Sequence, residues 1–333
     1  METRKVQRTG KSTFIVSLPK LWAVKNDIQP GSLIYITQSD NGALVLSPDR
    51  SERELATRLE IGDKVGDPLI RDIIGCYVSG YRTMEVTGAH MTADQKRDIH
   101  QIVQKLIGPE ILEETVNKVL IQDLIDPEEL QSERALRRIK TVVRSMIQDA
   151  LSAMVTNDRE MAADVIQRDD DVDRLYLLVS RQFTEILRSG SLKEESIDPI
   201  TAFNYTRAAT NLERMADHAS RIADMILRCD CTLPAEVAEG MGRISPQLLS
   251  LIEDSISSLL LLNSGKANEV IELSRQLRRE MILMVSSASS SGEHEDALLR
   301  MVASSIERIL DYIKNIGELA INLSQTGPRP EAK

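Results

Sequence analysis

Leu212-Glu213-Arg214-Met215-Ala216-Asp217 returns almost unchanged, further along the chain, as Ile306-Glu307-Arg308-Ile309-Leu310-Asp311. Each copy is followed five residues later by an isoleucine and seven residues later by an acid, which is Asp224 in the first copy and Glu318 in the second. Such self-similarity indicates an internal repeat. The chain therefore contains a helical module twice.

The acids of each copy recur at i, i+4 and i+11, a spacing that places three carboxylates on one narrow face of a helix. Like charges at i,i+4 destabilise a helix by about 0.2–0.5 kcal/mol per pair. An acidic stripe kept in both copies predicts a compensating cation or a partner. The alternative is a solvated helix face whose carboxylates pair with nearby Arg and Lys side chains, as most charge stripes do.

Helical periodicity extends over the whole C-terminal part of the chain and predicts six helices, at residues 128–157, 159–188, 197–228, 236–264, 266–286 and 295–324. Asp164-Val165-Ile166 aligns with Glu269-Val270-Ile271, which extends the duplication to the middle helix of each triplet. The expected fold is mainly α, with tandem three-helix bundles at 127–232 and 233–326 and a short tail at 327–333.

Two smaller modules precede the bundles. Residues 1–50 contain three expected strands, at 12–18, 33–37 and 43–47, with Asn41-Gly42 as a hairpin turn. So few short strands cannot close a core alone, and we expect this β domain to form a homodimer. Residues 51–126 mix expected helices (67–81, 92–106) with expected strands (83–87, 116–121) and form a short α/β connector.

Charge is distributed unevenly along the chain. The net charge is −10, yet residues 1–25 carry six Lys or Arg against one acid. Arg4, Lys5, Arg8 and Lys11 are expected to contact the phosphate backbone of DNA. The alternative is an ordinary basic surface that orients the N-terminal module on the acidic helices.

The middle helix of the first unit adds acids to the stripe, because Asp169 and Asp173 also stand at i,i+4. Clustered carboxylates without a matching cation form a hard, oxygen-rich site suited to a divalent metal ion. The positions that align with Asp169, Asp170 and Asp173 in the second unit are Ser274, Arg275 and Arg278. The second site is therefore weaker, or Arg275 and Arg278 replace the metal with an internal ion pair.

Other function classes find little support in the sequence. A di-iron bundle needs Glu-x-x-His on two helices, whereas His218 follows Glu213 by five residues and is expected to be a polar surface residue or a neighbour of ligands. Four scattered histidines give no nucleophile arrangement, so we expect no enzyme. The Cys229-Asp230-Cys231 spacing is too tight for an unstrained disulfide. With no signal peptide and no leucine run long enough to span a bilayer, this indicates a cytoplasmic protein without membrane insertion.

Two segments resemble known families. Residues 1–50, with "RKVQRTGKSTFIVSLPKLWAVKNDIQPGSLIYI" and "DNGALVLSP", resemble the swapped-hairpin DNA-binding domain of the AbrB and MazE class. Residues 130–325, with "LERMADHASRIAD", "IERILDYIKNIGE" and "RDDDVDRLY", resemble the PhoU family of tandem three-helix bundles. The two modules in this order are similar to archaeal phosphate-uptake regulators.

The resemblance implies metal clusters on the bundle surface and a negative regulator of phosphate import and phosphate-responsive gene expression, without catalysis. It also implies contacts with a phosphate ABC transporter and, in bacteria, a sensor kinase. The metal, whether Fe, Zn, Mn or Mg, is left open. Carried over by position, the first cluster comprises Asp169, Asp173, Glu213, Asp217 and Asp224, and the second comprises Glu307, Asp311 and Glu318.

The sequence thus leads to two main hypotheses. The first is a dimeric, metal-binding regulator of phosphate homeostasis that contacts DNA through its basic N-terminal domain. The second is an adaptor that docks on a transporter or another protein and uses residues 1–50 only for dimerisation. A third, an oxygen-activating metalloenzyme, is disfavoured by the missing Glu-x-x-His pairs.

Overall fold

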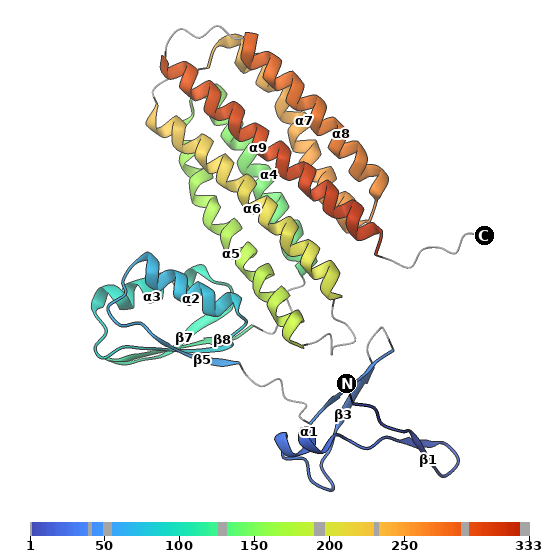
Figure 1. The fold of residues 1–333 in the computed structure, drawn as a ribbon. Coiled ribbons are helices and arrows are strands. Elements are labelled where there is room, and N and C mark those ends of the chain that lie inside the picture. The colour runs from blue at the N-terminus through green and yellow to red at the C-terminus, as the bar shows by residue number, and fades with distance from the viewer. Residues whose placement is uncertain are drawn as a thin grey trace, which may run out of the picture. The chain divides into compact units, whose positions relative to one another are not determined.

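The computed structural model describes residues 2–38, 42–48, 55–125, 132–189, 197–229, 233–287 and 293–326. The described residues fall into two compact units, one before residue 49 and one from residue 55 onward. Figure 1 shows their elements.

The N-terminal unit consists of two antiparallel hairpins and one short helix. Strands β1 (Gln7–Thr9) and β2 (Thr13–Ile15) form the first hairpin, and β3 (Tyr35–Gln38) and β4 (Leu44–Ser47) form the second, with α1 (Lys20–Lys25) between them in sequence. The three expected strands are confirmed, although each is shorter than predicted, and β1 was not predicted. Gly42 has a positive φ of 80°, as a tight hairpin turn requires, while Asn41 lies outside the described residues.

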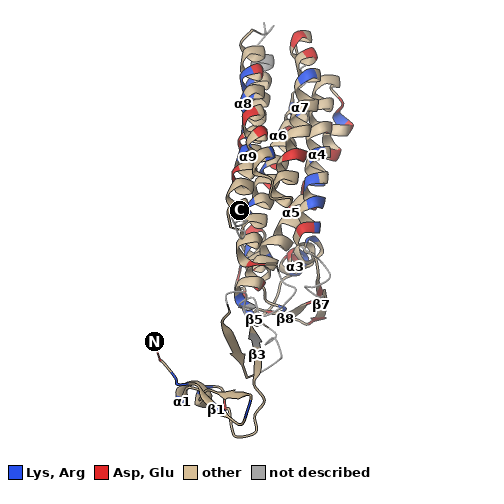
Figure 2. Ribbon diagram, turned by 90° about the vertical axis from the view of Figure 1, so that its right-hand side faces the viewer, with Lys and Arg blue, Asp and Glu red and all other residues tan. Residues whose placement is uncertain are grey.

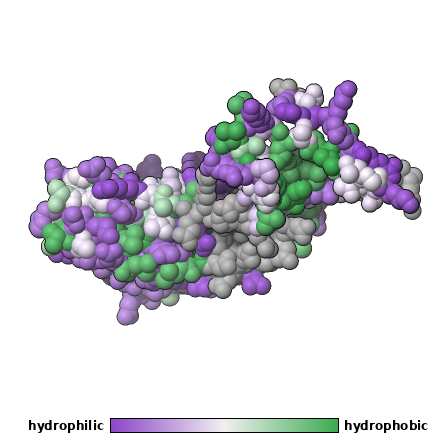
Figure 3. All heavy atoms as spheres, turned by 90° about the horizontal axis from the view of Figure 1, so that it is seen from below, coloured by the Kyte–Doolittle hydropathy of each residue, from purple (hydrophilic) through white to green (hydrophobic). Residues whose placement is uncertain are grey.

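None of the described residues in this unit is buried. Large apolar side chains face solvent instead, among them Phe14 at 71% and Leu21 at 88% exposure. Figure 3 shows hydrophobic side chains gathered on this unit. An exposed apolar surface of this kind marks an interaction site.

The α/β module contains β5 (Ala56–Glu60), α2 (Asp67–Val78), β6 (Thr83–Thr87), α3 (Ala93–Lys105), β7 (Pro109–Glu114) and β8 (Lys118–Asp123). The sheet order is β5-β6-β8-β7, in which only the β5–β6 pair is parallel. Helices α2 and α3 cover one face of the sheet (Figure 1), where Tyr77, Ile99 and Ile121 are fully buried. The two helices and β6 agree with the prediction and β8 overlaps it, whereas β5 and β7 were not predicted.

The described remainder of this unit is helical: α4 (Ser132–Thr156), α5 (Arg159–Ser189), α6 (Pro199–Arg228), α7 (Ala235–Leu260), α8 (Ser264–Ser287) and α9 (Glu293–Ser324). The six predicted helices are confirmed. One apolar cluster runs through all six, so the two three-helix units share a core and α6 packs directly on α9. The core is built almost wholly from Leu, Ile, Val, Ala and Met, as the low aromatic content of 3% requires.

One expectation about the cysteines was wrong. Cys229 is disulfide-bonded, whereas Cys76 is a free thiol. The partner of Cys229 therefore lies outside the described residues.

Candidate metal centre

The buried faces of α6 and α9 follow the repeated pattern. Leu212, Met215 and Ile222 of α6 are fully buried, and so are Ile306, Ile309 and Ile316 of α9. This apolar stripe sets the rotation of each helix, because it must face the shared core. The acids that adjoin buried residues of this stripe in sequence are consequently held at the edge of that core.

Four of the predicted acids come together where α5 packs on α6. Asp169 and Asp173 project from α5, and Glu213 and Asp217 project from α6. We call these four side chains the acidic cluster. Among the described residues, none of the four has an ion-pair partner, and the charges of Asp169, Asp173 and Asp217 raise the pKa of other members. Glu213 and Asp169 are half-buried, whereas Asp173 and Asp217 are exposed.

The raised pKa values of the acidic cluster reflect negative charge that no ion pair compensates. Burial, followed by the charges of Asp217, Asp173 and Asp169, raises the pKa of Glu213 to about 7. Partial burial and the same kind of repulsion raise the pKa of Asp173 to about 6. The Asp173 side chain is exposed, and solvent screens this repulsion.

The pKa values of the other two members, Asp169 and Asp217, are also raised. Burial and the charge of Asp217 raise the pKa of Asp169, and the nearby Ser220 hydroxyl partly opposes this. Burial also raises the pKa of Asp217, against the lowering effect of Arg221 and Arg214. Carboxylates with raised pKa values and no ion-pair partner repel one another. A bound cation relieves this repulsion, so such a group of side chains favours cation binding.

Asp224, predicted to belong to the same cluster, is engaged elsewhere. Its carboxylate is 2.8 Å from Nε of Arg228, one turn further along α6. The structure therefore brings together four of the five acids assigned to the first site and places the fifth in an ordinary exposed ion pair.

In the second unit two of the three corresponding acids, Asp311 and Glu318, form ion pairs with cations. Arg278 of α8 forms an ion pair with Asp311 and also donates to the backbone oxygen of Glu307 at 3.0 Å. Lys314 lies 3.3 Å from Glu318. Arg275 instead pairs with Glu272 of its own helix at 3.2 Å. Of the two arginines considered as substitutes for a metal, Arg278 takes that place and Arg275 does not.

The side chains in the acidic cluster are not closed around one point. Within the described ranges, no three His, Cys, Asp or Glu side chains converge as a group that could hold a metal ion. The donor set nevertheless fits a hard cation, since it consists of carboxylate oxygens that form no ion pair among the described residues. Side-chain rotation would be needed to gather them, and the two i,i+4 pairs on adjacent helices place them within reach of one another.

His218 is more buried than the sequence suggested. It has 8% exposure, and burial together with the charges of Arg221 and Arg308 lowers its pKa to about 4. It therefore lies as a neutral ring between α6 and α9. The expectation of a polar surface residue was wrong, because the acidic stripe alone does not reveal which neighbouring positions face α9.

The α/β module supplies a lysine that the sequence did not single out. Nζ of Lys105, at the end of α3, donates to Asp170 on α5 at 2.8 Å, and its charge lowers the pKa of Asp173. Asp170 is therefore neutralised, unlike its neighbours in the acidic cluster. Nothing in the sequence pattern places α3 beside α5, so this contact depends on tertiary structure.

The four basic residues predicted to contact DNA are all exposed on the N-terminal unit. Arg8 lies in β1 and donates to the backbone oxygen of Lys11 in the hairpin turn, while Arg4 pairs with Glu2. The Arg8 contact holds two of the four residues at the same end of one hairpin. Figure 2 marks basic residues in blue on this unit and both charge signs on the helices of the bundle.

The PhoU domain model matches residues 136–226 and 241–320, which together make up more than half of the chain. The chain belongs to the PhoU family. Residues 7–54 match a second model, antidote-toxin recognition MazE, bacterial antitoxin. The family matches thus agree with the two resemblances drawn from the sequence.

Individual PhoU proteins align with this chain over most of their own length. The phosphate-specific transport system accessory protein PhoU homolog of Clostridium acetobutylicum is 27% identical over 60% of this chain and 92% of its own. Homolog 2 of Thermotoga maritima is 23% identical over 55% of this chain and 80% of its own. The crystal structure of PhoU from Pseudomonas aeruginosa superposes with a TM-score of 0.53 at 18% identity, covering 59% of this chain and 96% of that one. In the described part of the chain, no helix is both long and apolar enough to cross a membrane.

Proposed function

We propose that this PhoU-family protein is a metal-binding negative regulator of phosphate uptake and of phosphate-responsive transcription. Family membership supports the regulatory part, since the relatives are named accessory proteins of phosphate-specific transport systems. The proposal gives the chain a regulatory role, not a catalytic one. Its partners would be components of a phosphate ABC transporter and DNA, and it would act in the cytoplasm, where both are accessible.

The single observation that carries the metal assignment is the contrast between the two units. The acidic cluster of the first unit lacks ion-pair partners, whereas in the second unit Arg278, at the position aligned with Asp173, forms an ion pair with Asp311, the residue aligned with Asp217. Asp169, Asp173, Glu213 and Asp217 would hold a divalent or trivalent cation at the α5–α6 surface. A bound cation would supply the positive charge that is missing there and tie the two helices together.

The N-terminal unit supports the transcriptional part of the proposal. It matches the MazE model, exposes four basic residues near one hairpin and has no buried residue among those described. Such a unit needs a second surface to cover its apolar side chains, and a homodimer would supply one. Dimerisation would also present the basic residues twice to a duplex.

Fluorescence anisotropy with duplex DNA across a salt series tests this part. The full chain should bind with a log–log salt slope steeper than about −3, because each phosphate contact releases counter-ions. Changing Arg4, Lys5, Arg8 and Lys11 to Ala should remove binding. Changing Lys20 and Lys25 of α1 to Ala is the matched control and should preserve most of it.

The second candidate is a docking adaptor that does not bind DNA. The contacts of Arg4 with Glu2 and of Arg8 with the Lys11 carbonyl favour it, because they engage part of the basic surface. If no duplex binds, including the region upstream of the protein's own gene, while the chain is a dimer in solution, the adaptor replaces the DNA-binding regulator. Loss of the gene should raise phosphate uptake under either candidate, and unchanged uptake would contradict both.

A further inference from the structure

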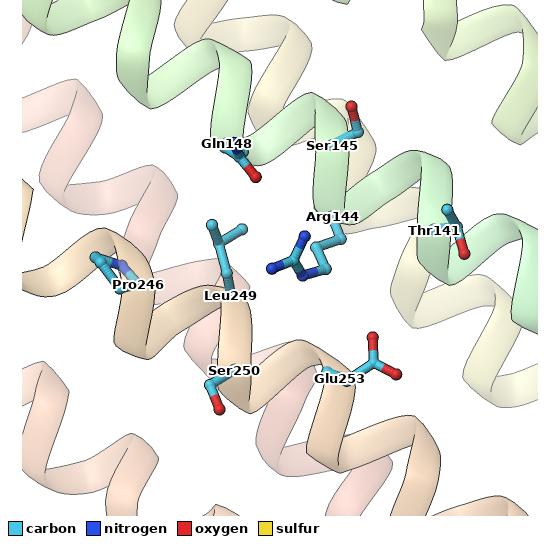
Figure 4. A pocket seen from close by; sticks show the side chains of 8 residues that line it. All are labelled: Thr141, Arg144, Ser145, Gln148, Pro246, Leu249, Ser250 and Glu253. Atoms are coloured by element: carbon cyan, nitrogen blue, oxygen red, sulfur yellow. The ribbon is translucent and has the colours of Figure 1, made fainter.

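A pocket of about 560 Å³ lies between α4 and α7, the first helices of the two three-helix units. Figure 4 shows Arg144, Ser145 and Gln148 on the α4 side and Pro246, Leu249 and Glu253 on the α7 side. Its size is that of a small-molecule site. The pocket shares no lining residue with the acidic cluster and has no role in the function proposed above.

Two donors in this pocket have no partner. In the described part of the chain, neither the half-buried guanidinium of Arg144 nor the carboxamide of Gln148 makes a hydrogen bond or an ion pair. Figure 4 shows both groups pointing from α4 into the space between the helices. A guanidinium presents five N–H donors, so that of Arg144 can bind an acceptor that enters the pocket.

The acid that lines the pocket does not supply the missing charge, since Glu253 forms an ion pair with Lys140. Arg144 is therefore a cation in surroundings that are otherwise neutralised. The local field at the pocket favours an anion.

The opposite wall is shaped differently. Leu249 provides an apolar surface, and Pro246 interrupts the hydrogen bonding of α7 because it has no N–H. The α4 side of the pocket is thus polar and cationic, and the α7 side combines the apolar Leu249 and Pro246 with the polar Ser250 and Glu253. Such a site can take an anionic group together with an organic remainder.

We propose that this pocket binds a tetrahedral oxyanion, namely a phosphate group, with Arg144 as its principal ligand and Gln148 as a second donor. The planar guanidinium matches two oxygens of a phosphate at once, which makes arginine the usual residue for such recognition. The group could be inorganic phosphate or the terminal phosphoryl group of a nucleotide. Because α4 and α7 belong to different units, an anion held there would link the two halves of the bundle. A regulatory meaning for this link rests on the proposed function, whereas the binding itself does not.

Isothermal titration calorimetry of inorganic phosphate and of ATP into the full chain tests the proposal. The protein is first treated with a chelator, so that phosphate bound to metal at the acidic cluster does not contribute. Arg144→Gln should weaken binding by roughly tenfold or more, as expected for loss of a charge-assisted bidentate contact. The matched control is Arg137→Gln, on the same helix but paired with Glu133 at 2.8 Å and outside the pocket, and it should bind like the wild type.

A third variant tests whether negative charge in the pocket wall opposes phosphate binding. Glu253→Gln removes a carboxylate from the pocket wall and releases Lys140, so phosphate should bind several-fold more tightly. Tighter binding of ATP than of phosphate would identify a nucleotide as the source of the group, and the reverse would identify the free ion. Equal affinity of Arg144→Gln and the wild type, or no saturable binding of either ligand up to about 10 mM, would overturn the proposal. Metal binding at the acidic cluster can fail without affecting any of these results.

Discussion

His218 and Tyr312 occupy the same position in the two copies of the repeated helix, and their rings face each other across the α6–α9 interface with centroids 5.9 Å apart. The duplication therefore brings equivalent residues into contact, as expected when two similar units pack about an approximate twofold axis. Both residues are buried, His218 at 8% and Tyr312 at 7% exposure. The interface between the two units depends on a neutral imidazole at this point.

This burial predicts a loss of stability in acid. The folded-state pKa of His218 is about 4, below its ordinary value of 6.5, because the ring is buried and faces the cations Arg221 and Arg308. Its contribution to stability is therefore present above pH 6.5 and is lost as the pH falls toward 4. Thermal unfolding measured at pH 7 and pH 4.5 should show a smaller acid-induced drop for His218→Gln than for the wild type. An equal drop in both proteins would contradict this prediction.

The acidic cluster predicts the opposite pH dependence in metal-free protein. The pKa of Glu213 is raised to about 7 from 4.5, so repulsion weakens the fold above pH 7 and is relieved as the pH falls through 7. Glu213→Gln should stabilise the metal-free chain at pH 8 by on the order of 1 kcal/mol, after allowance for screening by solvent, and by little at pH 5. Urea unfolding at both pH values measures this. Glu307→Gln, at the equivalent position of the second unit, is the control and should give no such gain.

Arg181 should be needed to hold the α/β module on the bundle. Its buried guanidinium lies 2.8 Å from the Asp123 carboxylate, donates to the Tyr77 backbone oxygen at 2.7 Å and stacks over the Tyr77 ring at 4.9 Å. Arg181→Met would leave Asp123 buried without its cation, at a cost of about 3–5 kcal/mol. Hydrogen exchange should then accelerate in α2 and β8. Arg58→Met, at an exposed arginine of the same module, should leave exchange in these elements unchanged.

We infer that the second unit lacks an acidic cluster because Arg278 occupies the position aligned with Asp173. Arg278→Asp places an acid at the position aligned with Asp173 and removes the cation from Asp311. We expect this variant to bind more metal per chain than the wild type in equilibrium dialysis. Arg275→Asp is the control, since Arg275 pairs only with α8 residue Glu272 and its aligned residue Asp170 is outside the acidic cluster. Equal metal content in Arg278→Asp and the wild type would count against this explanation.

Most of the fold was predictable because it follows local periodicity. The six helices of the bundle begin and end within a few residues of the predicted bounds, since long amphipathic stripes and Pro or Gly breaks mark them. Strands β5 and β7 were missed because both lie at sheet edges. The alternating β5 sequence Ala56–Glu60 is short, and β7 begins with Pro109, which argues against a strand.

The candidate site was predictable only in part. Residues on one helix face, such as Glu213 and Asp217, follow from spacing, and the α5 acids follow from the same rule. Which acids find a cation is decided by contacts between helices distant in sequence. Lys105 reaches Asp170, and Arg228 rather than the cluster takes Asp224. Nothing in the sequence singled out the unpaired Arg144, because its environment forms only when α4 packs on α7.

The most direct test of the central claim is the metal content of the full chain, measured by inductively coupled plasma mass spectrometry after loading with Mn²⁺, Zn²⁺ or Fe²⁺ and removal of free ions. We expect the wild type to retain metal. The double variant Glu213→Gln with Asp217→Asn should lose it while remaining helical by circular dichroism, and Glu307→Gln with Asp311→Asn should retain it. Wild-type metal content in the first double variant would contradict the assignment of the acidic cluster as the metal centre.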